Sequence, residues 1–243
     1  MPKRASTRRS IKNIHRYSPI PAIYKCPIEI FDEIFSMACT DGGETGRSLS
    51  TVSKRICEVS KVFKYRTLHV KQHQLRPLAR VLRSLPLDAR RVVHLFILPP
   101  DLGQPFFASQ RDRFFDIDKN RVLALVAHSL RTLKVATNHA QLLLPITLPF
   151  LWDLTMHSAL EVVEKCTKRK KACYPALKRF HFTHYRFWYK PNIISLVVRN
   201  APTLEIFKLT CHPSCQHEIE DFLEKPTSLK IVCCSLSVGF LLE

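Results

Sequence analysis

Apolar residues recur at helical spacing in two stretches near the start of the chain. The first stretch, 28–38, carries two adjacent apolar rows, Ile30, Ile34 and Met37 and then Phe31, Phe35 and Ala38. The second alternates spacings of three and four, with apolar residues at Leu49, Val52, Ile56, Val59 and Phe63. Such spacing predicts an amphipathic helix at 28–38. The second stretch, 49–63, is either one amphipathic helix or two helices with a bend near Ser53. Either they form a small cluster of their own or they are the first helices of a larger core.

The ends of the first helix are also indicated by the sequence. Pro27 suits the first turn of a helix, and Glu29 places negative charge near its positive end. The pair Gly42-Gly43 after Asp41 is a poor helix interior and predicts a turn. We therefore expect the helix to end before residue 42.

A strand-like pattern repeats through the rest of the chain. Each copy has apolar residues at positions i, i+3 and i+5. The copies are Tyr65-Leu68-Val70, Val92-Leu95-Ile97, Leu130-Leu133-Val135, Leu151-Leu154-Met156, Leu177-Phe180-Phe182, Leu204-Phe207-Leu209 and Leu229-Val232-Cys234. Their starts lie about 20 to 40 residues apart, mostly in the twenties, as in leucine-rich repeats. The pattern predicts strands that stack side by side, because no single repeat can bury its face alone.

Helical signals and prolines separate several of these strands. The helical signals are Val122-Leu125-Val126, Leu160-Val163-Cys166 and Ile193-Ile194-Val197. A proline precedes the strand in three copies, at Pro175, Pro202 and Pro226, where it breaks any preceding helix. Helix and strand in alternation predict a parallel sheet with helices on its other face. The alternative is an unrelated α/β domain.

One segment, 99–119, does not fit the repeat, and we interpret it as an inserted loop. It contains two pairs of aromatic residues, Phe106-Phe107 and Phe114-Phe115. These pairs either pin the loop to the repeats or present apolar anchors to a partner. Burial is the commoner outcome for aromatic residues in a loop, so we favour pinning.

Composition indicates a folded protein. The chain has 243 residues, 46% of them hydrophobic, and only 5 glycines. Its longest charge-free run, 135–152, is too short and too polar for a membrane span. No secretory signal is visible, so the 9 cysteines are expected to be reduced thiols, in the cytoplasm or the nucleus.

The net charge of +18 offers a competing interpretation, since strongly basic chains often bind nucleic acid. Residues 1–23 form a basic arm without acidic residues, for which a mitochondrial transit peptide is a less favoured alternative. The run Lys168-Arg169-Lys170-Lys171 resembles a nuclear localisation signal but equally suits a solvated loop. Only Tyr185–Lys190 interleaves aromatic with basic residues as nucleic-acid binders do.

Enzyme chemistry is not indicated. The chain lacks the Gly-rich phosphate loops, the His-Glu-x-x-His pattern and the Gly-x-Ser-x-Gly pattern, and its 11 histidines are scattered. The cluster Cys211-His212-Cys215-His217 offers zinc ligands, but four ligands on so short a loop cannot easily reach tetrahedral positions. We expect no catalytic residue, no metal site and no cofactor.

The N-terminal stretch resembles an F-box, a small helical docking module. The resemblance is carried by Pro27-Ile28-Glu29-Ile30, by Ile34-Phe35 and by Leu49-Ser50-Thr51-Val52-Ser53-Lys54-Arg55. It is most similar to F-box proteins of mushroom-forming fungi. The resemblance implies a three-helix F-box at 24–66, followed at 67–243 by an irregular domain resembling leucine-rich repeats, with strands on one face and helices on the other.

The resemblance also implies a function. Such a protein is the substrate-recognition adaptor of an SCF-type cullin-RING ubiquitin ligase. Its F-box binds a Skp-family linker and, through it, a cullin, and the repeats bind a protein target that we cannot name. The residues expected to contact the linker are Pro27, Ile28, Ile30, Ile34, Phe35, Leu49 and Val52, with Val59 as a weaker candidate. The alternative is a basic nucleic-acid-binding or nuclear scaffold protein that uses the F-box outside a ligase.

Overall fold

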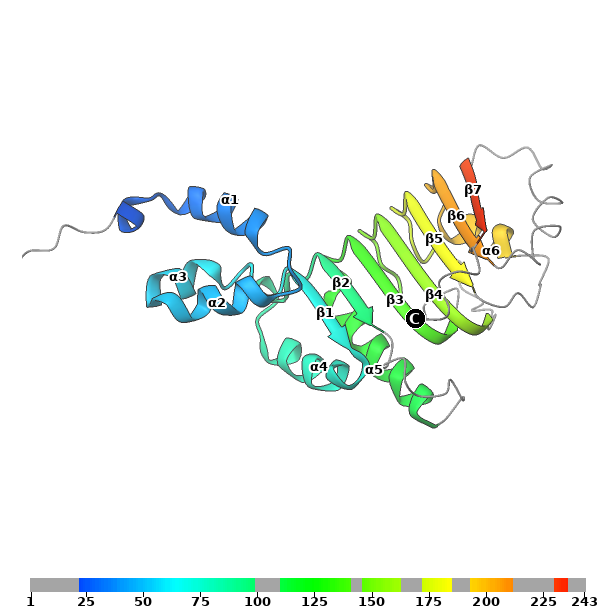
Figure 1. The fold of residues 1–243 in the computed structure, drawn as a ribbon, viewed down its shortest axis with the longest axis horizontal. Helices are drawn as coiled ribbons and strands as arrows, with labels where there is room; N and C mark the ends of the chain where they lie inside the picture. Colours follow the sequence, from blue (N-terminus) through cyan, green and yellow to red (C-terminus); the bar gives the residue numbers. More distant parts are fainter. Residues whose placement is uncertain are drawn as a thin grey trace, which may run out of the picture.

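The computed structural model describes residues 22–98, 110–140, 146–162, 172–184, 193–211 and 230–235. Within these ranges the protein is a mixed α/β structure. A group of short helices at the N-terminal end leads into one open parallel sheet, which is lined by further helices (Figure 1).

The N-terminal group, which we call the helical cluster, spans residues 22–63. It consists of a 3-10 turn, Ala22–Lys25, and three helices, α1 (Ile28–Ala38), α2 (Glu44–Val52) and α3 (Lys54–Ser60). The second apolar stretch, 49–63, is thus covered by two helices and not by one, which was one of the two predicted alternatives. They separate at Ser53, whose backbone is extended and whose Oγ accepts the N–H of Ile56 at 3.2 Å. This side-chain cap starts α3.

The helical cluster has its own small hydrophobic core. Its buried residues are Phe31, Phe35, Cys39 and Ile56, and partly buried apolar residues that include Leu49, Val59 and Phe63 pack around them. The rings of Phe35 and Phe63 meet edge to face, with centroids 6.1 Å apart. The sheet has a separate hydrophobic core. Tyr65 and Leu68 are the residues closest to the N-terminus that pack against it.

Seven parallel strands form the sheet, and their order in the sheet is their order in the sequence. The strands are β1 (Thr67–Lys71), β2 (His94–Leu98), β3 (Thr132–Ala140), β4 (Asp153–Val162), β5 (Arg179–His184), β6 (Ile206–Cys211) and β7 (Lys230–Ser235). Each strand therefore lies beside the one that precedes it, as Figure 1 shows from cyan to red. The predicted parallel sheet is confirmed.

Strand register follows the repeated apolar pattern through six strands. The middle apolar residues pair across the sheet in the series Leu68, Leu95, Leu133, Leu154, Phe180 and Phe207. The last strand is offset from the prediction by one residue. Phe207 and Leu209 pair with Ile231 and Cys233, and not with Val232 and Cys234. Because side chains alternate between faces, a slip of one residue exchanges the two sets, and the all-apolar run around Ile231 gave no alternation to fix it.

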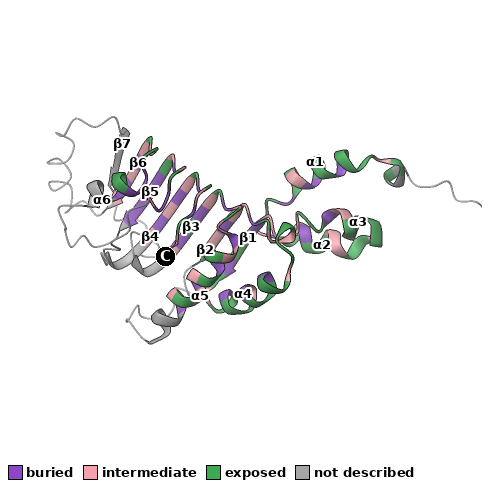
Figure 2. Ribbon diagram, turned by 180° about the vertical axis from the view of Figure 1, so that it is seen from behind, coloured by how far each residue is buried: buried purple, intermediate pink, exposed green. Residues whose placement is uncertain are grey.

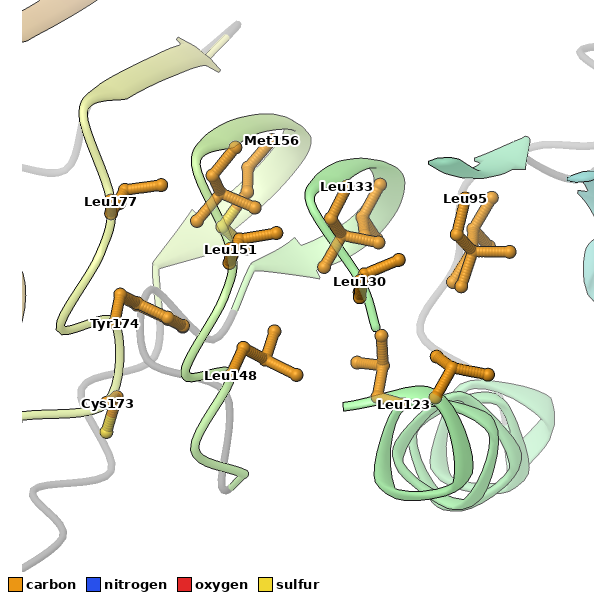
Figure 3. Close-up of a cluster of buried hydrophobic side chains, with 14 of the residues drawn as sticks. Leu95, Leu123, Leu130, Leu133, Leu148, Leu151, Met156, Cys173, Tyr174 and Leu177 are labelled. Carbon is orange, nitrogen blue, oxygen red and sulfur yellow. The ribbon is translucent and has the colours of Figure 1, made fainter. Parts of the chain in front are cut away.

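Three helices line one face of the sheet: α4 (Leu75–Ser84), α5 (Gln110–Val126) and α6 (Ile193–Asn200). Two 3-10 turns, Gln72–Gln74 and Asp88–Arg90, flank α4. Leu82 of α4, Leu123 of α5 and Val197 of α6 share one core with the apolar strand residues, so the helices lie on the face to which those residues point. In Figure 3, Leu148 and Leu151 from one coil and Leu177 from the next contribute to this core alongside Leu123.

Two sequence predictions are corrected by the helices and strands. Residues 110–119, expected to belong to an inserted loop, form the first half of α5, and residues 99–109 lie outside the described residues. Phe115 is buried in the core, as the pinning alternative expected, but it lies in a helix and not in a loop, and Phe106 and Phe107 lie outside the described residues. Leu160, expected in a helix, belongs to β4, because the pairing of β3 with β4 continues to Ala140 and Val162. Hydrogen-bonded pairing with β3 therefore decided the conformation at Leu160, although the local spacing of apolar residues was helical.

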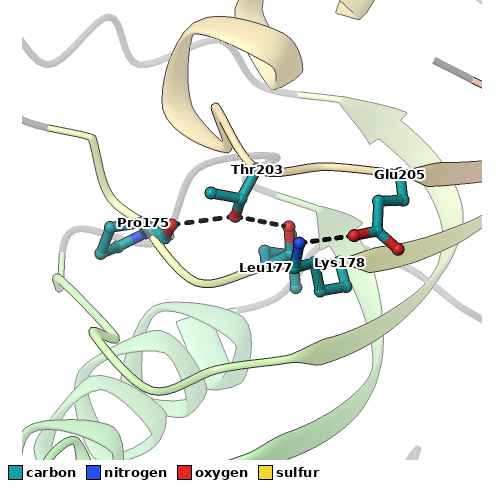
Figure 4. Close-up of polar contacts among 5 residues, drawn as sticks. All are labelled: Pro175, Leu177, Lys178, Thr203 and Glu205. Atoms are coloured by element: carbon teal, nitrogen blue, oxygen red, sulfur yellow. Dashed lines mark hydrogen bonds and ion pairs between the residues drawn. The ribbon is translucent and has the colours of Figure 1, made fainter. Parts of the chain in front are cut away.

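A backbone turn recurs just before successive strands. In each copy two consecutive N–H groups donate to one carbonyl of the preceding coil, for instance Lys178 and Arg179 to Trp152 at 3.0 and 3.1 Å. The accepting carbonyls are those of Arg66, Val93, Arg131, Trp152 and Lys178. In the last of these turns the Thr203 hydroxyl bonds the carbonyls of Pro175 and Leu177, beside the Lys178–Glu205 ion pair (Figure 4). Hydrogen bonds thus tie each coil to the next.

The turn at Asp41-Gly42-Gly43 joins the helical cluster to the edge of the sheet. Gly42 and Gly43 have φ values of 82° and 101°, which residues other than glycine rarely adopt. The carboxylate of Asp41 caps the turn by accepting the N–H and hydroxyl of Thr45, at 2.8 and 2.5 Å. These bonds, the hydroxyl above all, lower the pKa of Asp41. α1 ends at Ala38, before residue 42 as predicted, and the paired glycines let the turn approach β1.

Candidate protein-interaction surfaces

The two apolar rows of α1 have different environments. Phe31 and Phe35 are buried in the helical cluster, whereas Ile30, Ile34 and Met37 are 45%, 47% and 66% exposed. Figure 2 shows this alternation as purple and green bands along α1. We call the exposed row Ile30, Ile34 and Met37 the α1 surface. Its residues lie at i, i+4 and i+7, so they share one side of the helix.

The expected linker-binding residues fall into three groups. Pro27, Ile28, Ile30, Ile34 and Val52 are exposed, with Val52 at 65%. Leu49 and the weaker candidate Val59 are half-buried and pack against the core of the helical cluster. Phe35 is only 5% exposed, so it supports the cluster from inside and does not lie on its surface. Periodicity could not separate these groups, because both rows of α1 have the same spacing.

Exposed apolar residues at this density need a physical explanation. Fully burying one large aliphatic side chain contributes about 1.5 to 3 kcal/mol, so a row of them is a source of binding free energy when a partner covers it. Glu29, Asp32 and Glu33 are also exposed and occupy a different side of α1. The α1 surface is thus an apolar stripe between a buried side and an acidic side, the arrangement of a helix that docks on an apolar groove.

The second surface is the face of the sheet away from α4, α5 and α6. Its residues form three rows across the strands, and neighbours within a row are paired in register except Leu98 and Ala136, which directly follow the last pair of β2 and β3, Ile97 and Val135. Row one is Thr67, His94, Thr132, Asp153, Arg179 and Ile206, row two is His69, Phe96, Lys134, Thr155, His181 and Lys208, and row three is Lys71, Leu98, Ala136, His157, Thr183 and Thr210. We call these three rows the open sheet face. Most of its residues are half-buried or exposed, in contrast to the apolar residues between them (Figure 2).

Histidines gather on the open sheet face. The rings of His157 and His181 lie 6.1 Å apart, and His69 meets the ring of Phe96 edge to face at 4.6 Å. The Nε2 atom of His181 is 2.9 Å from the Thr210 hydroxyl and 3.3 Å from that of Thr183. Sequence spacing left these histidines scattered, and the strand register brings them together. The available signal was the i, i+2 alternation of each strand combined with the repeat.

Burial and neighbouring cations lower the pKa of three imidazoles on this face, those of His157, His181 and His94. Burial, with Lys134 and His181 nearby, lowers the pKa of His157 to about 4. Burial also lowers the pKa of His181, with Lys208 and Lys134 adding to the effect and Asp153 opposing it. The pKa of His94 is lowered by burial and by two arginines, Arg66 and Arg131. These shifts favour the uncharged form of the three imidazoles, which takes part in hydrogen bonds without adding positive charge.

Arg179 and Asp153 form the ion pair of the open sheet face. Their side chains meet at 2.8 Å, and the guanidinium of Arg179 also lies 4.2 Å from the centre of the Trp152 ring. The pair neutralises one carboxylate and one guanidinium in row one. Rows two and three contain no acidic residue, so the remaining charge of the face is positive.

Neither a metal centre nor a membrane helix is found in the part of the chain that the structure describes. No three His, Cys, Asp or Glu side chains there converge on a possible metal position. None of the described helices is both long and apolar enough to cross a bilayer. The cluster from His212 to His217, the basic run 168–171, the segment 185–190 and residues 1–21 of the basic arm lie outside the described residues.

Comparison of the chain with protein-family models, with curated proteins and with solved structures found no match.

Proposed function

We propose that the chain is an F-box protein that acts as the substrate-recognition subunit of an SCF-type ubiquitin ligase. In this proposal the helical cluster is the F-box and binds a Skp-family linker, through which the chain reaches a cullin. The sheet and its helices form a domain resembling leucine-rich repeats that holds a protein target. The chain contributes no catalytic group, and its effect on ubiquitin transfer is positional, because it raises the local concentration of target lysines.

The single observation that carries the proposal is the division of α1 into two apolar rows. A helix that only supported a core would bury its apolar residues and leave polar ones outside. In α1, Phe31 and Phe35 already supply the core, and Ile30, Ile34 and Met37 are additional apolar residues left at the surface. A docking helix needs both sets, one to hold its own module together and one to meet the partner.

Two further observations support the division of labour. The helical cluster has a hydrophobic core of its own, so its partner-binding helix is supported independently of the sheet. The strands follow one another across the sheet in sequence order, with a recurring hydrogen-bonded turn before them, as expected of stacked repeats. Together they fit an adaptor in which one module binds a linker and an extended surface binds a target.

The test compares two isoleucines of matched exposure in the full-length chain. Ile34 on α1 is 47% exposed and Ile117 on α5 is 46% exposed. Binding to a purified Skp-family linker is measured for the unaltered chain, Ile34→Asp and Ile117→Asp. We expect binding by the unaltered chain and by Ile117→Asp, and a loss of at least ten-fold for Ile34→Asp, since a charge on a desolvated apolar contact costs more than about 1.4 kcal/mol.

Two outcomes are decisive against the proposal. If the unaltered chain does not bind the linker, or if Ile117→Asp weakens binding as much as Ile34→Asp, the helical cluster is not an F-box interface. A second measurement adds cullin to the linker complex. A chain that holds the linker and fails to recruit the cullin is a scaffold outside a ligase and not a substrate adaptor.

A further inference from the structure

Row two of the open sheet face carries two separated cations with polar groups between them. Lys134, Thr155, His181 and Lys208 are in register on the consecutive strands β3, β4, β5 and β6. Lys134 is exposed and Lys208 is half-buried. The four side chains therefore form a line that crosses the strands, with a lysine at each end.

These lysines are not neutralised by the part of the chain that the structure describes. Asp153 is the one carboxylate in the three rows of the open sheet face, and Arg179 holds it at 2.8 Å. Neither Lys134 nor Lys208 has a described acidic side chain within ion-pair distance. Two cations without described counter-charges on one line make this part of the face electropositive, so it favours an anionic partner, and salt screens the half-buried Lys208 less than the exposed Lys134.

We propose that the open sheet face binds an extended protein segment that carries acidic side chains. The inference rests on the proposed function only in assigning the target to this face. The lysines at the two ends of the line pair with carboxylates of the segment. Between them, Thr155 offers its hydroxyl to the backbone of the segment, while Nε2 of His181 already meets the Thr210 hydroxyl at 2.9 Å.

Strand geometry sets the spacing of the acidic residues. Neighbouring strands lie about 4.8 Å apart, so the α-carbons of Lys134 and Lys208, three strand intervals apart, are separated by about 14 Å. In an extended segment, side chains on one side recur every two residues, or about 6.7 Å, so positions i and i+4 are about 13 Å apart. The structure therefore favours a target with acidic residues four apart.

Nucleic acid is the other anionic partner that a basic chain suggests, and the composition of the face argues against it. Single strands bind where bases can stack on exposed aromatic rings. The three rows contain one such ring besides the histidines, Phe96, and the edge of His69 already meets it at 4.6 Å. Threonines, at five positions of the face, provide hydroxyl groups and no stacking surface.

The test uses the full-length chain and a labelled peptide of Ser and Thr with two glutamates at positions i and i+4. Binding is measured by fluorescence anisotropy at low and at physiological salt. The double variant Lys134→Ala/Lys208→Ala is compared with Arg76→Ala/Arg80→Ala, which removes the same charge from exposed positions of α4. We expect the first to weaken binding about ten-fold and the second to change it less than two-fold. A peptide with lysines in place of the glutamates should not bind.

Three results would overturn the inference. They are equal weakening of peptide binding by the two double variants, equal binding of the lysine peptide and the glutamate peptide, and tighter binding of a single-stranded oligonucleotide that is lost when Lys134 and Lys208 are replaced.

Linker binding by the same double variants separates this inference from the proposed function. A Lys134→Ala/Lys208→Ala chain that keeps the linker and loses the acidic peptide supports both. A chain that binds the peptide through these lysines and never binds the linker supports only the acidic-segment site.

Discussion

The backbone N–H of His69 donates a hydrogen bond to the carbonyl of Gly42 at 3.4 Å, and this bond joins the edge strand of the sheet to the turn that ends α1. The His69 side chain also lies close to Gly42. A Cβ atom added to Gly42 would lie 2.7 Å from Cγ and Nδ1 of the His69 ring. A glycine at 42 thus serves two requirements at once, a positive φ of 82° and room for the His69 ring.

The first prediction separates these two requirements. Gly43 also has a positive φ, but a Cβ there would meet its nearest atom only at 3.4 Å. Gly43→Ala should therefore cost about 1 kcal/mol of unfolding free energy from backbone strain alone, and Gly42→Ala should cost about 2 to 3 kcal/mol. Adding His69→Ala to Gly42→Ala should recover most of the difference, because the ring is removed while the His69 Cβ, 3.2 Å from the added Cβ, stays. Urea denaturation of the single and double variants measures the coupling, and simple additivity would contradict this account.

A second prediction concerns the two rows of α1. Phe35→Ala removes a ring from the core of the helical cluster and should lower the unfolding free energy of the cluster by about 3 to 4 kcal/mol. Ile34→Ala removes an exposed side chain and should change it by less than about 0.5 kcal/mol. Thermal denaturation followed by circular dichroism measures both. Equal destabilisation by the two variants would mean that the rows of α1 are not divided between core and surface.

A third prediction concerns the buried lysine of α5. Lys119 is 1% exposed, its Nζ lies 2.5 Å from Oδ1 of Asp116, and it sits 5.3 Å from the centre of the Phe115 ring. Asp116→Asn leaves the ammonium without its counter-charge and should destabilise the fold by about 3 kcal/mol. Lys119→Met keeps the shape without the charge and should be neutral or stabilising. Denaturant midpoints of both variants test the pair, and a Lys119→Met chain that unfolds more readily than Asp116→Asn contradicts it.

A fourth prediction follows from the lowered pKa of His157, about 4 in the folded protein against an ordinary value of 6.5. Between these values the unfolded chain binds the extra proton, so the stability associated with neutral His157 is present above pH 6.5 and falls as the pH drops towards 4. Solvent screening at this half-buried site limits the loss to roughly 1 to 2 kcal/mol. His157→Gln should remove that part of the acid sensitivity, measured as unfolding free energy at pH 7 and pH 4.5.

The control for the fourth prediction is His73→Gln, at an exposed position outside the sheet. It should leave the difference between the two pH values as it is in the unaltered chain. If His157→Gln and the unaltered chain lose the same stability on acidification, the imidazole of His157 is not held neutral by its surroundings.

The sequence by itself determined the strands of this protein and part of its helices, whereas α4 was not predicted and the first half of α5 was expected to be a loop. The repeated apolar pattern located all seven described strands, and in the first six it also located the residues that face the core, because each strand has one side against the helices and one open side. The glycine pair indicated that α1 ends before residue 42, and Ser53 was one of two alternatives for 49–63, a bend between two helices, which the structure shows. Local spacing failed where pairing competed with it. Leu160 joined β4 through its pairing with β3, and Ile231 took the place expected for Val232.

Only the tertiary structure decided which side chains are available to a partner. Phe35 and Ile34 are adjacent and similarly apolar, yet one fills the core of the helical cluster and the other lies on its surface. Lys134 and Lys208 are far apart in sequence, yet strand register sets them on one line with His181. The reason is physical. Periodicity is a property of one element, whereas exposure and neighbourhood depend on what packs against that element, and packing is set by contacts between distant parts of the chain.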